Sequence, residues 1–237
     1  MNPHVLFEAL AYVVGFRIYR RDRRRAGDPI DDSTRWSIVA AAIVGAAVGS
    51  RLLYWSVSPA QTLAHWDDVR YLLGGKTVVG GILGGILAVE LTKRALGVTA
   101  RTGDLFAVPF AVGIAIGRVG CFLAGLPDRT YGSPSRLPWA VDFGDGIPRH
   151  PVQLYESLTM IVLAFWLRRL LRRPHHQGDV FRVFVVAYLS WRFAIDFLKP
   201  EPTIAGGLSA IQIAALAGVV AYAKDIHRWL RFGMTHE

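Results

Sequence analysis

Long apolar stretches that alternate with short basic tracts constrain the fold of this chain more than any other feature. Hydrophobic residues make up 52% of its 237 residues. Crossing the hydrocarbon core of a bilayer takes about 20 mostly apolar residues. The sequence therefore predicts an all-α, polytopic membrane protein, with one membrane domain over residues 1–237. The seven transmembrane helices are expected near 3–19, 36–57, 77–97, 104–126, 151–171, 179–198 and 205–223.

The distribution of positive charge predicts the orientation. The formal net charge is +9, but Lys and Arg gather in tracts such as 20–25 and 168–173, between the apolar stretches. One set of alternate connections carries seventeen Lys and Arg residues and the other carries six. Short cytoplasmic loops retain positive charge, so this bias predicts an N-terminus outside and a C-terminus in the cytoplasm. The pattern favours a multi-pass protein of the bacterial inner membrane over a nucleic-acid-binding protein.

Two further segments follow from this orientation. Residues 127–150 are rich in Pro, Gly and Asp, and we expect them to form an outward-facing irregular loop. Residues 224–237 begin with mixed basic and aromatic side chains, which predicts a tail along the cytoplasmic interface. The single cysteine, Cys121, excludes an internal disulfide framework and a zinc site built from cysteines.

Several charged residues fall inside or near the ends of the apolar stretches. An Arg at the centre of a membrane helix costs at least ~2.5 kcal/mol on insertion scales, so it should face the bundle interior and meet a carboxylate or an anionic ligand. Each such residue is a candidate for a functional site. They are Arg51, Arg118, Arg192, Glu8, Glu90, Glu156 and Asp196.

Arg192 and Asp196 lie four residues apart, and Tyr188 lies one turn earlier on the same face of the expected helix. This polar stripe has two readings that the residues leave open. It is either part of a site, or an intrahelical salt bridge that lowers the cost of inserting the helix.

Arg118 is flanked by Gly117 and Gly120, which remove side-chain bulk and let another group approach the guanidinium. One interpretation is a tight helix-packing seam. The other is a binding site, because the planar guanidinium fork suits phosphate oxygens and would attract a phospholipid headgroup in a low-dielectric bundle.

The run from His150 to Glu156 opens a predicted span directly after the outer loop. Gln153 and Glu156 are three residues apart and share a helix face, with Tyr155 beside them. Glu156 alone could compensate the helix dipole, but that does not explain Gln153 and Tyr155. His150 is either a general base or a solvated loop residue.

The motifs Gly117-Arg118-Val-Gly120-x-Phe and His150-Pro-x-Gln153-Leu-Tyr155-Glu156 resemble the paired signature of the prolipoprotein diacylglyceryl transferases. Further similarity covers nearly the whole chain and includes Tyr12-Val-Val-Gly-Phe and Gly-Ser-Arg51. The resemblance implies transfer of a diacylglyceryl group from phosphatidylglycerol to a lipobox cysteine at the outer face of the inner membrane. It implies no metal and no soluble cofactor.

The resemblance also implies roles for individual residues. Arg118 and Arg192 would bind and stabilise the phosphate, Asp196 would orient Arg192, and Tyr12 and Tyr188 would line the lipid cavity. The candidate catalytic residues are Arg118, Arg192, Asp196 and His150. The candidate substrate-binding residues are Tyr12, Arg51, Gly117, Gly120, Gln153, Tyr155, Glu156, Tyr188 and Asp128.

The chain departs from the family pattern at four positions. Val79 stands where the family usually carries a His, and Cys121, Ala124 and Leu126 replace two Asn and one Glu. Asp128 could restore the lost carboxylate by a small shift. These changes indicate a divergent paralogue, in which Cys121 is either an inert packing residue or an internal lipid acceptor.

Three functions are compatible with these features. The first is a transferase that uses a lipoprotein cysteine or another acceptor. The second is a non-catalytic protein that binds anionic phospholipid. The third, a channel or ion-coupled transporter, predicts internal repeats or broken helices that the sequence lacks.

Overall fold

The computed structural model describes residues 3–232 and is mostly helical, with few strands. The long helices are α1 (Pro3–Ala26), α2 (Asp32–Val57), α5 (Val78–Ala95), α6 (Asp104–Ala124), α7 (Val152–Leu170), α8 (Asp179–Ile195) and α9 (Ala210–Ala221). The short helices are α3 (Pro59–Ala64), α4 (Val69–Gly74), α10 (Ala223–Phe232), η1 (Leu126–Asp128) and η2 (Asp196–Leu198). The strands pair in two antiparallel ribbons, β1 (Val141–Asp142) with β2 (Pro148–Arg149) and β3 (Thr203–Ala205) with β4 (Leu208–Ser209).

Each segment that the sequence predicts to span a membrane overlaps one of the long helices, and α1 and α2 extend beyond their expected segments. Within the described residues, α2 and α6 are the helices whose length and apolarity suffice to cross a bilayer, with mean hydropathies of 1.7 and 1.9. α1 ends in a basic run and α9 is only 12 residues long. The helical class is confirmed, and the number of spans stays a prediction.

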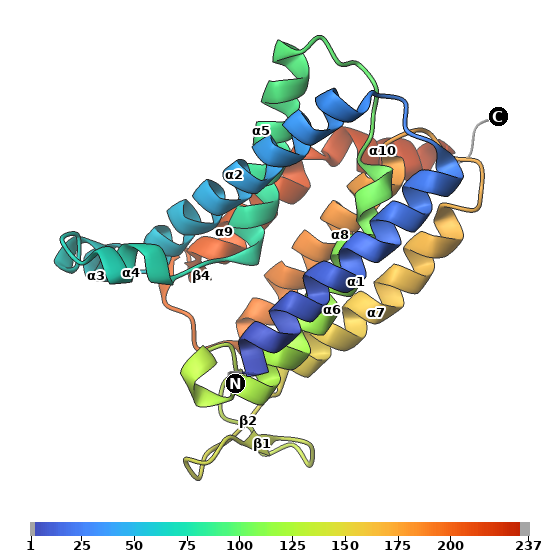
Figure 1. Cartoon of the computed structure of the whole chain (residues 1–237). Helices are drawn as coiled ribbons and strands as arrows, with labels where there is room; N and C mark the ends of the chain where they lie inside the picture. Colours follow the sequence, from blue (N-terminus) through green and yellow to red (C-terminus); the bar gives the residue numbers. More distant parts are fainter. Residues whose placement is uncertain (1–2, 233–237) are drawn as a thin grey trace.

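The long helices form two groups that α8 and α9 join (Figure 1). In one group α1 packs along α6, which also packs against α7; in the other α2 packs along α5. α8 contacts α6, α7 and α9, and α9 contacts α2 and α5. The apolar core surrounds α8, where Phe184, Tyr188 and Leu189 have no exposed surface.

α2 and α5 approach so closely that their backbones touch. A Cβ atom added to Gly45 would lie 2.5 Å from the carbonyl oxygen of Gly84, and one added to Gly49 would lie 2.4 Å from that of Gly80. Real side chains do not tolerate such contacts. Small residues at a helix interface are the usual means of close packing in a membrane, where the lipid supplies no hydrophobic driving force.

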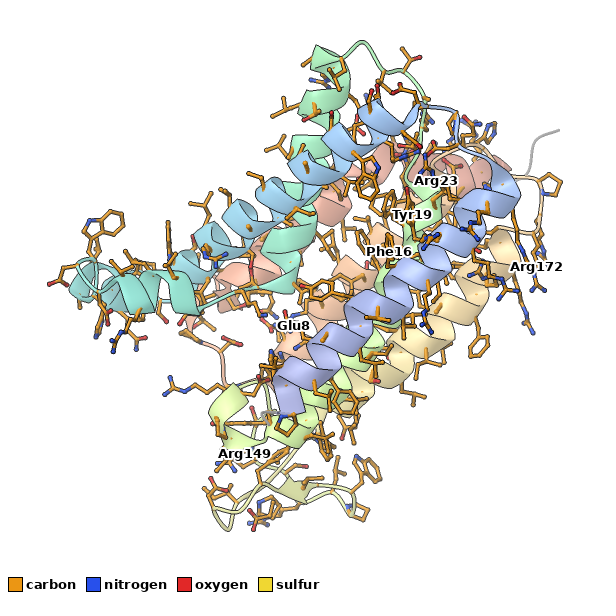
Figure 2. The ribbon with its side chains drawn as sticks, viewed as in Figure 1. Glu8, Phe16, Tyr19, Arg23, Arg149 and Arg172 are labelled. Carbon is orange, nitrogen blue, oxygen red and sulfur yellow. The ribbon has the colours of Figure 1, made fainter. Side chains whose placement is uncertain are left out.

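The connections that differ in charge lie at opposite ends of the bundle. Arg23 and Arg172 lie at the end that carries α10, whereas Glu8 and Arg149 lie toward the other end (Figure 2). Alternate connections of membrane-spanning helices must share a side, so this arrangement has the geometry that the charge bias requires. Which end faces the cytoplasm stays a prediction.

The connection at 58–76 holds the short helices α3 and α4. Pro59 occupies the first turn of α3, where its missing N–H costs nothing, and the Asp68 side chain accepts hydrogen bonds from the first N–H groups of α4. The segment 127–150 holds the end of η1 and the β1–β2 ribbon, closed by two 2.7 Å contacts between Arg149 and Asp145.

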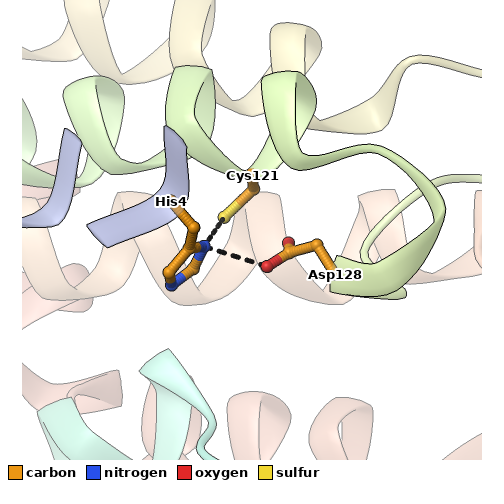
Figure 3. A group of neighbouring side chains, drawn as sticks. All are labelled: His4, Cys121 and Asp128. Atoms are coloured by element: carbon orange, nitrogen blue, oxygen red, sulfur yellow. Dashed lines mark hydrogen bonds and ion pairs between the residues drawn. The ribbon is translucent and has the colours of Figure 1, made fainter. Parts of the chain in front are cut away.

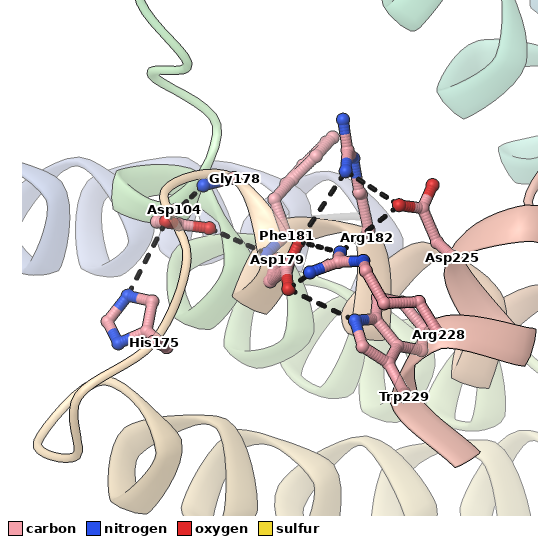
Figure 4. Close-up of polar contacts among 9 residues, drawn as sticks. All are labelled: Asp104, His175, Gly178, Asp179, Phe181, Arg182, Asp225, Arg228 and Trp229. Carbon is pink, nitrogen blue, oxygen red and sulfur yellow. Dashed lines mark hydrogen bonds and ion pairs between the residues drawn. The ribbon is translucent and has the colours of Figure 1, made fainter. Parts of the chain in front are cut away.

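The C-terminal helix α10 docks onto the start of α8 (Figure 4). Asp179 is fully buried and accepts hydrogen bonds from Arg228, at 2.7 and 2.8 Å, and from Trp229 at 3.1 Å. Arg182 extends the network to Asp225 at 2.8 Å. The tail predicted at 224–237 therefore begins as a helix, residues 233–237 lie outside the described part, and its interfacial placement stays a prediction.

Candidate functional site

The central feature of the site is a buried ion pair between α6 and α7. The Nε atom of Arg118 lies 2.9 Å from Oε1 of Glu156, whose side chain is 1% exposed. The hydroxyl of Tyr188, on α8, donates to the same carboxylate oxygen at 3.3 Å. Three helices thus bring together three residues that the sequence singled out separately. The pairing of Arg118 with Glu156 was not predicted, because α6 and α7 are joined by a long irregular segment.

A second buried ion pair lies at the end of α8. Nη1 of Arg192 lies 2.6 Å from Oδ1 of Asp196, as the four-residue spacing predicts. The angles do not form a hydrogen bond, so these two atoms have no hydrogen-bond partner among the described residues. The other oxygen of Asp196 accepts from the hydroxyl of Ser209, the N-cap of α9. Ser209 therefore fixes the carboxylate that faces Arg192.

Lys199 is a third buried cation beside this site. It is 9% exposed, although it is one of the six Lys and Arg residues that the sequence assigns to the less basic set of connections. Arg192 and Lys199 are both close enough to interact electrostatically with the Glu156 carboxylate. Lys199 follows Asp196 by three residues, and this spacing could have predicted its burial. The short helix η2 begins at Asp196 and ends directly before Lys199.

Gln153 contributes a polar side chain with unsatisfied atoms. It is 1% exposed, and neither its amide nitrogen nor its amide oxygen has a hydrogen-bond partner among the described residues. Buried polar groups are nearly always hydrogen-bonded, and exceptions call for an explanation. A polar ligand group that binds within the bundle would satisfy Gln153 together with the Arg192–Asp196 pair.

His150 and Tyr155 lie at the base of the β1–β2 ribbon and contact each other. Nδ1 of His150 lies 3.5 Å from the Tyr155 hydroxyl, which accepts a 2.7 Å hydrogen bond from the indole of Trp139. These contacts link both residues to the loop rather than to the buried ion pairs. The role of His150 as a general base stays a prediction.

Tyr12 and Arg51 are not brought to the buried ion pairs by any contact in the described residues. Tyr12 is 71% exposed and contacts Glu8 at 3.4 Å. Arg51 lies on α2, in the other helix group, where it donates to the backbone oxygens of Ala47 and Leu73. To bind substrate, Tyr12 and Arg51 would have to contact a part of the ligand that lies away from the Arg118–Glu156 and Arg192–Asp196 ion pairs.

The glycines around Arg118 differ in their surroundings. A Cβ atom on Gly117 would meet nothing within 4 Å, whereas one on Gly120 would lie 2.5 Å from Cβ of Phe7 on α1. Packing therefore accounts for Gly120, whereas Gly117 borders open space.

A family model described as prolipoprotein diacylglyceryl transferase matches residues 4–224. The chain belongs to this family. A relative from Bordetella bronchiseptica, named phosphatidylglycerol–prolipoprotein diacylglyceryl transferase, is 34% identical and aligns over 90% of this chain and 87% of its own length. Relatives with the same name from Nitratidesulfovibrio vulgaris and Clostridium tetani are 33% and 30% identical, covering 82% and 76% of this chain and 77% and 74% of their own lengths.

Membership of the prolipoprotein diacylglyceryl transferase family makes this chain a transferase and a membrane protein. The structure shows which groups surround Val79 and Asp128, two residues that bear on the chain's departure from the family pattern. Val79 is 1% exposed and belongs to the apolar core. Asp128 lies 2.9 Å from Nδ1 of His4. Its other oxygen accepts a 2.6 Å hydrogen bond from the hydroxyl of Thr130, and no ion pair or hydrogen bond among the described residues joins Asp128 to Arg118.

Proposed function

We propose that this protein transfers the diacylglyceryl group of phosphatidylglycerol to the cysteine thiol of a lipoprotein precursor. The names of its relatives state this reaction for those proteins. In the reaction the thiol sulfur forms a bond to the glyceryl carbon, and the bond from that carbon to the phosphate oxygen breaks. Glycerol phosphate leaves, and the thiol proton passes to a base.

The observation that carries the proposal is the cluster of Arg118, Arg192 and Lys199 around one carboxylate. Negative charge develops on the departing phosphate, and prearranged cations in a water-poor site stabilise it. Glu156 and Asp196 hold the guanidinium groups before substrate arrives, and Ser209 holds Asp196. Arg118 and Arg192 are the proposed catalytic residues, and Asp196 is the proposed positioning residue for Arg192.

The membrane arrangement belongs to the same proposal. We infer seven spans, from α1, α2, α5, α6, α7, α8 and α9, in a bacterial inner membrane. The basic end with Arg23 and Arg172 would face the cytoplasm. The β1–β2 ribbon and His150 would then face outward, on the side where a secreted precursor presents its cysteine.

The test uses purified protein, phosphatidylglycerol labelled in its headgroup, and a peptide that carries a lipobox cysteine. Release of labelled glycerol phosphate should require the peptide and should fall at least about a hundredfold in Arg118→Ala and Arg192→Ala, as removal of a transition-state donor does. Asp67→Asn, at an exposed position of the α3–α4 connection, is the matched control and should keep the wild-type rate. Release no faster than in a protein-free blank contradicts the proposal.

The second candidate, a non-catalytic phospholipid-binding protein, is favoured by the buried apolar surroundings of Val79. Native mass spectrometry separates it from the transferase. Retention of phosphatidylglycerol that Arg118→Ala and Arg192→Ala abolish, without turnover over a panel of thiol and hydroxyl acceptors, would support the binding protein. Turnover with a hydroxyl acceptor alone would instead support a transferase with a different substrate.

A further inference from the structure

His4, Cys121 and Asp128 converge on one point at the end of the bundle where α1 begins (Figure 3). Nδ1 of His4 lies 2.9 Å from a carboxylate oxygen of Asp128 and 3.8 Å from the sulfur of Cys121. The three ligand atoms all lie within 4.8 Å of one another. We propose that these residues form a binding site for a zinc-type divalent cation.

The close contact of α1 with α6 creates the cluster. Gly120 leaves room for Phe7, and a Cβ atom there would also lie 3.6 Å from Cα of His4. His4 therefore lies over Cys121, the next residue along α6. η1 then turns the chain so that Asp128 reaches the same imidazole nitrogen.

The geometry distinguishes a metal site from a nucleophile relay. In a relay, the thiol and the carboxylate would contact opposite nitrogens of the imidazole, as in catalytic triads. Here both face Nδ1. Tetrahedral zinc with ordinary bond lengths separates nitrogen, sulfur and oxygen ligands by about 3.3–3.6 Å. The 2.9 Å separation of His4 and Asp128 would widen by about 0.5 Å and the 3.8 Å separation of His4 and Cys121 would shorten by about 0.3 Å to reach those values.

The surroundings support the same assignment. Nε2 of His4 lies 3.6 Å from Glu8, whose other oxygen contacts Lys76 at 2.6 Å. A carboxylate at the second nitrogen is the usual partner of a metal-binding histidine, because it fixes the ring and its tautomer. A Cys121 thiolate and the Asp128 carboxylate together balance a divalent cation, while Lys76 balances Glu8.

The donor set indicates which cation binds. Thiolate and imidazole favour zinc over magnesium or calcium, which prefer oxygen ligands. The site differs from zinc sites built from several cysteines, and the wide spacing of His4, Cys121 and Asp128 in the sequence does not predict it. Three protein ligands leave a fourth position for water or a small ligand. This inference is independent of the proposed transfer reaction.

The test measures metal binding by the purified full chain, carrying no polyhistidine tag, after chelator treatment and without added lipid. Wild type should retain one zinc ion per chain against competing micromolar chelator. With cobalt it should show the ultraviolet charge-transfer band of a cobalt–thiolate bond. Because Cys121 is the single cysteine of the chain, that band in wild type reports on this site directly. Its absence from the wild-type spectrum overturns the proposal, whatever the variants do.

Three conservative variants test the ligands. Cys121→Ser, His4→Gln and Asp128→Asn should each weaken zinc binding at least tenfold, and Cys121→Ser should abolish the charge-transfer band. The matched control is His65→Gln, at a histidine whose Nδ1 contacts the backbone oxygen of Gln61, and it should bind zinc as wild type does. Equal zinc affinity in wild type, Cys121→Ser and His4→Gln would overturn the proposal.

Discussion

The Arg118–Glu156 pair joins two charges that have almost no exposed surface, so each depends on the other. Removing one partner of a buried ion pair leaves an uncompensated charge and typically costs 3–5 kcal/mol. Glu156→Gln should therefore destabilise the protein by about 3 kcal/mol, measured by unfolding in detergent. Asp67→Asn should change stability by less than about 0.5 kcal/mol. Equal stability of Glu156→Gln and wild type would show that Arg118 is solvated or paired elsewhere.

Lys199 gives the site a dependence on pH. It lies in the connection after η2, outside the long helices, and burial, reinforced by the positive charges of Arg192 and Arg118, lowers its pKa to about 7. The lysine is charged below this pKa and neutral above it, so its protonated fraction falls from about nine-tenths at pH 6 to one-tenth at pH 8. Retention of phosphatidylglycerol in native mass spectrometry should therefore weaken over this range.

Two variants isolate the contribution of Lys199. The Lys199→Arg side chain stays charged from pH 6 to pH 8. Retention of phosphatidylglycerol by this variant should therefore stay strong and lose the pH dependence that Lys199 causes. Lys199→Gln lacks the charge throughout, so binding should be weak and nearly constant. A Lys199→Gln protein that loses lipid between pH 6 and pH 8 as wild type does would assign the titration to another group.

At the scale of elements, the glycine contacts fix the distance between α2 and α5. Gly84→Ala should push the helices apart, because a Cβ there lies 2.4 Å from the carbonyl oxygen of Gly45. Overpacking of this kind costs about 1–3 kcal/mol. The control, Gly81→Ala on the same helix, meets nothing nearer than 3.7 Å and should be neutral or stabilising. Thermal unfolding in detergent compares them, and equal midpoints would contradict the close packing.

The docking of α10 depends on one buried carboxylate. Asp179→Asn removes the charge that Arg228 and Trp229 contact, so α10 should detach more often. Limited digestion with trypsin should then cleave within 223–232 several times faster than in wild type. His227→Ala changes an exposed residue of the same helix and should leave the rate unchanged. Unchanged cleavage of Asp179→Asn would show that other contacts hold α10.

For the whole molecule, the two ends of the bundle should face opposite sides of the membrane. In a Cys121→Ser background, Arg136→Cys should react with a membrane-impermeant maleimide in intact cells from which the outer membrane has been removed. Arg172→Cys should react only after the inner membrane is permeabilised. Both positions are exposed, so accessibility to the reagent is the difference measured. The reverse pattern would invert the predicted orientation.

The sequence predicted elements and individual charges better than the contacts between them. Hydropathy placed a long helix in every expected span, and the spacing of Arg192 and Asp196 predicted their ion pair, because both depend on local periodicity. The pairing of Arg118 with Glu156 depends on how α6 and α7 pack across a long connection. The burial of Lys199 depends on η2, and the convergence of His4 with Cys121 depends on the contact of α1 with α6. Periodicity carries no information about these arrangements.

The most direct measurement of the proposed reaction is the intact mass of a lipobox peptide after incubation with purified protein and phosphatidylglycerol. The account predicts a gain of one diacylglyceryl group on the cysteine sulfur, lost with Arg118→Ala and Arg192→Ala and absent from a peptide whose cysteine is replaced by serine. A peptide of unchanged mass, beside wild-type protein that retains phosphatidylglycerol, would contradict it.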